Sequence, residues 1–247
     1  MLHARHEYTP GGAFGRGVHL WTYGYAGLPV IAFPTAGGYA HEWQQHGSVG
    51  VLSDWLAEGR IRLYCPETNA AEVWVHPTTD VSHRMRRNTA YEQYIVQELM
   101  PRIQRETGHR QAVTIGASVG ALYAINMGLK YPHLFKKAIG LSGRYNARSF
   151  TDDRDHDDLY YANPLAYAWN LHGEHLQHIR QNTQVTLVCG QGAHEGRCLG
   201  DTRQLGAALH NVGAPVWLDL WGKDVSHDWH WWQRQTRYHL GLTLRGK

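Results

Sequence analysis

Cysteine is scarce in this sequence, which argues against a fold held together by disulfide bonds. Cys65, Cys189 and Cys198 are an odd number, and they show neither the spacing of a metal-binding motif nor that of a redox motif. Cys65 and Cys189 lie inside short apolar runs of the kind that form strands. We therefore expect these two thiols to pack in the core.

Long apolar runs are also absent. No uncharged stretch is long enough to span a membrane, and the N-terminal residues lack the apolar segment of a secretory signal. From these two absences we expect a cytoplasmic protein that has no membrane partner.

An excess of one charge is missing as well. The chain carries 24 Lys and Arg against 21 Asp and Glu, a net charge of +3, without the basic stripe of a nucleic-acid-binding protein. One short basic cluster is interpreted as the solvated start of a helix; it consists of His83, Arg84, Arg86 and Arg87. No nucleic-acid partner is expected.

The glycine motifs that bind nucleotide phosphates do not occur, and two sets of potential metal ligands are better explained without a metal. His172, His175 and His178 recur at three-residue spacing, but such steps drift around a helix, which favours surface histidines. A run of aspartates lacks the glycine and the final glutamate of a calcium loop and is interpreted as a solvated tip; it contains Asp152, Asp153, Asp155, Asp157 and Asp158. No metal ion and no cofactor is expected.

What the sequence does contain is the alternation of an α/β protein. A chain of 247 residues is long enough for one such domain, which we expect to span residues 1–247. Short apolar runs predict strands near 18–25, 29–33, 61–65, 112–116, 137–141, 185–189 and 216–221. Segments of helical period predict helices near 49–58, 91–106, 119–130, 202–211 and 229–240, so the sheet should be mostly parallel with helices on both faces. Residues 144–181 break this rhythm and are expected to form a lid-like insert.

The most informative segment is an apolar strand, then Gly116-Ala117-Ser118-Val119-Gly120, then a helix. In such an elbow the serine is strained, small neighbours permit close packing, and the helix start directs N–H groups at the site. The alternative is a glycine-rich connection in which the serine only caps the helix. The strand before the motif and the helix after it favour Ser118 as a nucleophile.

Two further stretches make the resemblance to a family specific. The run from Gly116 through Gly143, with Tyr131-Pro132-His133 and Leu141-Ser142-Gly143, and the later His227-Asp228-Trp229 resemble the esterase D and mycolyltransferase-like branch of the α/β-hydrolases. The resemblance extends from about Pro29 onward and is weaker in the insert after Arg144. It implies an α/β-hydrolase fold and a serine esterase.

A serine hydroxyl needs a base, and the base needs a third group to orient it. His227 follows the last predicted strand on a loop, which is where this fold carries its histidine. His230 and His239 also lie near the C-terminus, but they fall inside the predicted terminal helix. We therefore take His227 as the base.

The acid is expected in the loop after strand 185–189, where two carboxylates compete. Asp201 precedes a helical pattern and is interpreted as its N-cap, with Gln204 completing a capping box. Glu195 has no such structural role and matches the glutamate of the mycolyltransferase-like enzymes, so we prefer it, although the esterase D group uses an aspartate. Asp224 and Asp228 lie too close to His227 in sequence to orient it.

The resemblance also implies an oxyanion hole made of two backbone N–H groups. One is that of Val119, directly after the serine. The second belongs to the glycine-containing loop 33–39, where Ala36 is the expected donor and Gly37 the alternative. Trp43, a few residues later, is expected either to line the acyl or leaving-group pocket or to pack in the core.

Together these features predict a serine esterase that hydrolyses a small-molecule carboxylic ester or thioester through an acyl-enzyme. The same groups can pass the acyl group to another alcohol, so an acyltransferase is the enzymatic alternative. A catalytically silent member of the fold that binds a ligand or partner is the other alternative. The sequence carries no signature of an oligomeric state.

Overall fold

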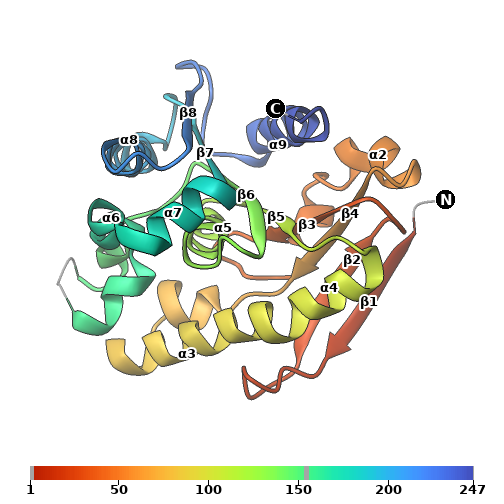
Figure 1. Ribbon diagram of the computed structural model, residues 1–247, viewed down its shortest axis with the longest axis horizontal. Coiled ribbons are helices and arrows are strands. Elements are labelled where there is room, and N and C mark those ends of the chain that lie inside the picture. Colours follow the sequence, from red (N-terminus) through yellow and green to blue (C-terminus); the bar gives the residue numbers. More distant parts are fainter. Residues whose placement is uncertain (1–2, 153–155, 247) are drawn as a thin grey trace.

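An eight-stranded sheet runs through the middle of the molecule, with helices on both of its faces (Figure 1). The computed structural model describes residues 3–152 and 156–246, so the expected role of Asp153 and Asp155 lies outside the described residues. The strand order is β1-β2-β4-β3-β5-β6-β7-β8. The pairs β1–β2 and β2–β4 are antiparallel, and all pairs from β4 to β8 are parallel. This is the mostly parallel sheet that the sequence predicts.

The bounds of the strands are β1 (Ala4–Thr9), β2 (Val18–Tyr23), β3 (Leu28–Phe33), β4 (Ile61–Pro66), β5 (Ala112–Ala117), β6 (Phe135–Leu141), β7 (Gln184–Cys189) and β8 (Val216–Leu220). The predicted strands are confirmed, each within two residues at either end. The sequence pattern does not reveal β1, because its side chains are mostly exposed and polar and it is held by pairing with β2 along one edge.

The α-helices are α1 (Glu42–Gln45), α2 (Ser53–Ala57), α3 (Val81–Tyr94), α4 (Met100–Thr107), α5 (Val119–Lys130), α6 (Pro164–Tyr167), α7 (Gly173–Asn182), α8 (Gly196–Asn211) and α9 (Trp229–Leu244). Short 3-10 or π turns add η1 (Gly50–Leu52), η2 (Ala71–Val75), η3 (Ile95–Leu99), η4 (Ala147–Phe150), η5 (Asp157–Ala162) and η6 (Ala168–Asn170). Apolar clusters bury α3, α4, α5 and α8 on one face of the sheet and α1, α2 and α9 on the other. None of the helices within the described residues is long and apolar enough to cross a membrane.

The sequence predicts a helix near 91–106, but the helical segment starts earlier, with α3, and includes the basic cluster. Not all side chains of that cluster are solvated. The helix begins at Val81, where the side chain of Asp80 accepts a hydrogen bond from the N–H of His83. Arg84 is 4% exposed and donates to the carbonyls of Val73 and Phe150, at 2.7 and 2.8 Å. The interpretation of a solvated cluster is therefore wrong for Arg84, because two backbone carbonyls replace water around its guanidinium.

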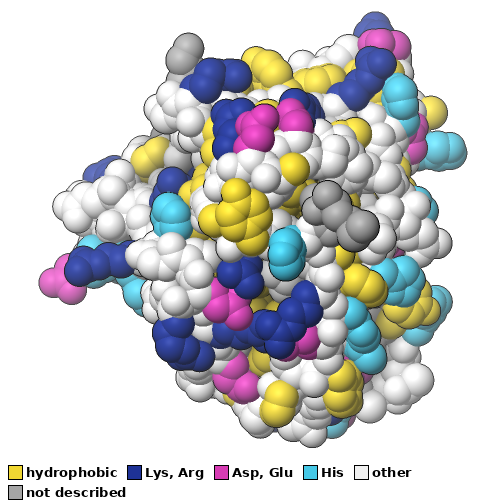
Figure 2. Space-filling model, turned by 90° about the vertical axis from the view of Figure 1, so that its right-hand side faces the viewer, with side chains coloured by type: hydrophobic (Ala, Val, Ile, Leu, Met, Phe, Trp, Pro, Cys, Tyr) yellow, Lys and Arg dark blue, Asp and Glu magenta, His cyan; other side chains and the backbone are white. Residues whose placement is uncertain are grey.

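On the side of the molecule that carries β1, Lys and Arg side chains lie in clusters beside Asp and Glu, among histidines and other residues (Figure 2). Arg102 of α4, for example, binds Glu7 of β1 and lies 2.7 Å from Glu106. Pairs of this kind tie the polar edge strand to the helix beneath it. They add to the pairing with β2 in holding β1, whose side chains are mostly exposed.

The insert between β6 and β7 is helical within its described residues and packs against α3, α5 and α8. The Tyr167 hydroxyl donates to Asn126 Oδ1 at 2.6 Å, and Asn126 Nδ2 donates to the carbonyl of Ala162 at 3.0 Å. At its start, the N–H of Arg144 donates to the carbonyl of Ser118. The insert is therefore anchored on α5 and begins beside the candidate nucleophile.

A buried histidine should make the fold sensitive to acid. His239 of α9 is fully buried 3.1 Å from Asp219 of β8, and burial lowers its pKa to about 4, against the attraction of Asp219. Its imidazole is protonated near pH 6.5 only in the unfolded chain, so the unfolded state takes up more protons as the pH falls from 6.5 toward 4. We expect the free energy of unfolding to decrease in that window, by on the order of 1–3 kcal/mol from this group.

Urea unfolding of the wild type and of His239→Gln between pH 7 and pH 4 measures this contribution. The variant should lose less stability on acidification than the wild type. His178→Gln, at an exposed position on α7, is the matched control and should follow the wild type. Parallel curves for all three proteins would contradict the assignment.

Candidate active site

Ser118 forms the turn between β5 and α5 and has a strained backbone. Its φ is 55° and its ψ is −118°, a conformation that residues with a side chain rarely adopt and that is concentrated at functional sites. Its N–H donates to the carbonyl of Leu141 at 2.9 Å, which holds the turn against the end of β6. The Ser118 side chain makes no cap hydrogen bond to α5, so helix capping does not account for this serine.

The two glycines of the motif allow a very close approach of backbones. A Cβ atom on Gly116 would lie 2.2 Å from the carbonyl oxygen of Gly120. A Cβ on Gly120 would lie 2.4 Å from the carbonyl oxygen of Pro34 and 2.6 Å from that of Phe33. The start of α5 is therefore pressed against both its own strand and the loop after β3.

His227 lies between the serine and a carboxylate. Its Nε2 is 3.2 Å from Ser118 Oγ, and its Nδ1 is 3.1 Å from Glu195 Oε2. A carboxylate at Nδ1 favours the tautomer that carries its proton there, which leaves Nε2 free to accept the serine proton. The backbone N–H of His227 donates to the carbonyl of Ala193 at 3.0 Å, so the histidine loop is fastened to the loop that carries Glu195.

Glycines bring these two loops together. A Cβ atom on Gly190 would lie 2.1 Å from the carbonyl oxygen of Val225, and one on Gly192 would lie 2.7 Å from the same atom. The N–H of Gly192 donates to that carbonyl at 2.9 Å. The backbone after β7 and the backbone before α9 thus run in contact up to the site.

Glu195 is fully buried and is surrounded by donors. Ser142 Oγ donates to its Oε1 at 2.5 Å, the N–H of Gly190 lies 3.4 Å from the same oxygen, and Cys189 Sγ is 3.5 Å from Oε2. Together with His227 these groups occupy both carboxylate oxygens. A buried carboxylate needs such partners because burial removes its hydration.

Sequence reasoning missed Ser142, which binds the acid directly, and Trp232, which binds Ser142. Ser142 follows β6 with a φ of 47°, and its hydroxyl also accepts a hydrogen bond from Trp232 Nε1 at 3.1 Å. The Trp232 ring meets the His227 ring edge to face, with centroids 4.8 Å apart. The sequence could have indicated Ser142, because it is a polar residue directly after the parallel strand β6. The carboxyl ends of parallel strands share one edge of the sheet, and Ser118 lies at that edge.

Asp201 is not a helix N-cap, so that interpretation is wrong. Helix α8 begins at Gly196, and Asp201 lies inside its second turn, because the residues before it continue the helix. Its Oδ2 accepts the N–H of Asn146 at 2.9 Å, and burial raises its pKa. Asp201 therefore fixes the start of the insert, whereas Glu195 is the carboxylate beside His227. Asp228, also considered, caps α9 by accepting from the N–H of Trp231.

The loop after β3 is fixed beside the serine. The carboxylate of Glu42 accepts the N–H of Thr35 at 2.5 Å and the hydroxyl of the same residue at 2.9 Å. The backbone N–H groups of Ala36 and Val119 donate to no protein acceptor within residues 3–152 and 156–246. Trp43 is 1% exposed and donates to the carbonyl of Phe33, so of its two expected roles the structure supports packing in the core.

One group of potential metal ligands occurs within the described part of the chain, and it overlaps the site. Ligand atoms of Glu195, Cys198 and His227 lie within 4.8 Å of one another. Burial, reinforced by Glu195, raises the pKa of Cys198 to about 12, so this thiol is protonated in the metal-free protein. Glu195 and His227 already bind each other, an arrangement suited to moving a proton. The histidines 172, 175 and 178 are exposed at α7, as expected.

The sequence family described as "Putative esterase" matches residues 67–236. No significant match was found among curated protein sequences. Several solved structures are similar over nearly the whole chain. A ferulic acid esterase is 16% identical with a TM-score of 0.71, covering 99% of this chain and 97% of that one.

Two further structures have the same fold. The S-formylglutathione hydrolase of Staphylococcus aureus is 14% identical with a TM-score of 0.70, covering 99% of this chain and 97% of its own. MPT51 (FbpC1) of Mycobacterium tuberculosis is 16% identical with a TM-score of 0.72, covering 97% and 98%. At these identities the similarity establishes the α/β-hydrolase fold, as expected from the sequence.

The close approach at the elbow gives a prediction that does not depend on function. Gly120→Ala places a methyl group against two backbone carbonyls, and we expect it to destabilise the protein by about 1–3 kcal/mol, since overpacking forces the backbone to shift. Urea unfolding midpoints measure the change. Gly200→Ala is the matched control, because it also lies in a helix and its Cβ would meet nothing within 4 Å.

The control should be neutral or should stabilise α8 by up to about 1 kcal/mol, because alanine favours helix more than glycine does. Equal stabilities for Gly120→Ala and the wild type would show that the loop after β3 can move away from α5 at little cost.

Proposed function

Because the chain belongs to the esterase family described as "Putative esterase", in the esterase D and mycolyltransferase-like branch, we propose that it is a serine esterase acting through Ser118, His227 and Glu195. The observation that carries the proposal is the continuous hydrogen-bonded chain from Ser118 Oγ through both nitrogens of His227 to Glu195. Each role follows from the position of the group in that chain.

In the first half of the reaction, Ser118 Oγ attacks the carbonyl carbon of an ester or thioester while His227 Nε2 takes the hydroxyl proton. The C–O bond to serine forms as the carbonyl becomes a tetrahedral oxyanion. We assign the stabilisation of its charge to the N–H groups of Ala36 and Val119, for which no acceptor occurs within the described residues. Val119 directly follows the serine, and Ala36 lies on the loop that begins at Pro34, whose carbonyl approaches the start of α5. His227 then returns the proton to the leaving alcohol or thiol, and the acyl-enzyme remains.

In the second half, water takes the place of the alcohol. His227 removes a proton from the water as it attacks the acyl carbon, and the serine oxygen leaves with that proton. Glu195 keeps its negative charge throughout and stabilises the imidazolium that forms twice in each cycle. The donors around Glu195, Ser142 above all, fix the direction in which it faces His227.

Ser118→Ala should abolish ester hydrolysis and labelling by a fluorophosphonate probe while the fold is retained, because the change removes one hydroxyl from a turn. Loss of a triad nucleophile costs several orders of magnitude in kcat. Turnover of an activated ester and covalent labelling are measured on the same preparations, with circular dichroism as the control for folding. Labelling of the variant, or a kcat above about a tenth of the wild type, would contradict the proposal.

The two carboxylates should respond differently to the same conservative change. Glu195→Gln should lower kcat by about a hundredfold or more, because an amide cannot stabilise the imidazolium or enforce the histidine tautomer. Asp201→Asn should keep most of the activity, because its amide oxygen can still accept the N–H of Asn146.

Measuring kcat for both variants on one activated ester compares the two roles directly. A crippled Asp201→Asn together with a nearly normal Glu195→Gln would assign the acid to Asp201 and overturn this part of the proposal.

A further inference from the structure

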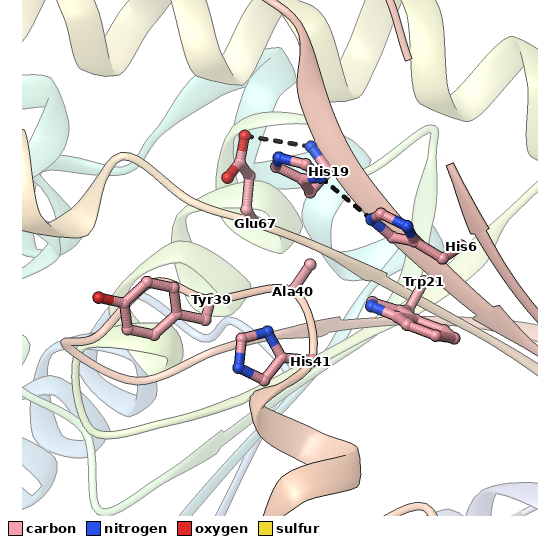
Figure 3. Close-up of a pocket in the computed structure, with 7 residues that line it drawn as sticks. All are labelled: His6, His19, Trp21, Tyr39, Ala40, His41 and Glu67. Atoms are coloured by element: carbon pink, nitrogen blue, oxygen red, sulfur yellow. Dashed lines mark hydrogen bonds between the residues drawn. The ribbon is translucent and has the colours of Figure 1, made fainter. Parts of the chain in front are cut away.

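A cavity of about 550 Å³ opens between the β1–β2 edge of the sheet and the loop that follows β3 (Figure 3). Two sets of rings line it. His6, His19 and Trp21 extend from β1 and β2, and Tyr39 and His41 come from the loop (Figure 3). A volume of this size is in the range of small-molecule sites.

The walls of this cavity are built of stacked rings. His6 lies on Trp21 with ring centroids 4.9 Å apart and planes 30° apart, and Tyr39 lies on His41 at 5.5 Å and 27°. Tyr39 is 62% exposed, so much of its surface remains open to a ligand. Flat rings that are already held by stacking offer a rigid surface for another planar ring.

The polar groups of the cavity favour an uncharged aromatic ring over a cation or a metal ion. Glu67 is the acid in its wall, and it is neutralised by Arg16 at 2.6 Å and accepts the N–H of His19 at 3.1 Å. His6 Nε2 and His19 Nδ1 are 3.0 Å apart and bond to each other. Within the described residues no third ligand atom joins this pair closely enough to complete a metal site.

The cavity lies at the end of the sheet where the parallel strands have their carboxyl ends, and Ser118 lies at the same end. Pro34 touches the elbow through Gly120, and Tyr39 follows five residues later, a span of at most about 17 Å. Strand β2 is three strands from β5, or about 14 Å at roughly 4.8 Å per strand. The loop that carries Ala36 thus connects the cavity to the candidate oxyanion hole.

We propose that this cavity binds an aromatic ring at the far end of the ester substrate, separated from the carbonyl at Ser118 by a spacer that spans about 14 Å. The inference rests on the proposed esterase function and adds a substrate class to it. The ring stacks between the β1–β2 wall and Tyr39.

The test compares esters that differ only in a terminal phenyl group. One series consists of methyl ω-phenylalkanoates of increasing spacer length, the other of acetates of ω-phenylalkanols, each paired with its alkyl counterpart and followed by proton release. The ratio of kcat/KM for the phenyl ester to that for the alkyl ester should grow with spacer length and reach about tenfold, the order expected from stacking and burial of one ring. Either series suffices, since the ring can lie on the acyl or the alcohol side.

Variants show whether the ring binds here. Tyr39→Ala and Trp21→Leu, on opposite walls, should each bring the ratio close to that of a short spacer. Tyr25→Ala, at a tyrosine outside the cavity that is 55% exposed, should leave the ratio unchanged. A wild type that hydrolyses alkyl esters with no phenyl preference at any length, or a preference that survives both wall variants, would overturn the inference alone. A wild type that hydrolyses no ester would overturn the proposed function itself.

Discussion

The close approach of α5 to the sheet is the constraint on which the rest of the site depends. Gly116 and Gly120 let the helix start against its own strand and against the carbonyls of Phe33 and Pro34. That contact sets the strained backbone of Ser118, aims the first N–H groups of the helix past the serine, and positions the loop after β3. A side chain at either glycine would separate these parts, so the strain of the serine is sustained by packing around it.

The second constraint is the burial of the Glu195 carboxylate. Placing Glu195 out of contact with water is unfavourable unless hydrogen bonds replace its hydration, and Ser142, Gly190, Cys189 and His227 supply them. Ser142 follows β6, Cys189 ends β7, and His227 precedes the last helix. Because the carboxyl ends of parallel strands share one edge of a sheet, loops distant in sequence converge there. The sheet topology thus brings Glu195 and its hydrogen-bond partners together from segments that are distant in sequence.

The similarity to the three solved structures, at 14–16% identity and TM-scores near 0.7, concerns the sheet and the helices around it. One fold can carry many activities, and proteins that share a fold differ mainly in the loops that carry their functional residues. In this chain the antiparallel strands β1 and β2 extend that edge and bring histidine and tryptophan rings next to the loop after β3. A further ring, that of Trp232, packs edge to face against His227.

The sequence by itself determined the parts that depend on neighbours along the chain. The apolar runs gave the parallel strands, the glycines around Ser118 indicated the turn, and the loop after the last strand indicated His227, since each signal lies within a few residues. The tertiary structure decided what depends on contacts between distant segments: the pairing of β1, the burial of Arg84, and the role of Ser142, whose partner Glu195 is 53 residues away. It also separated the two carboxylates, because a capping pattern at Asp201 looks the same in sequence whether the helix begins there or earlier at Gly196.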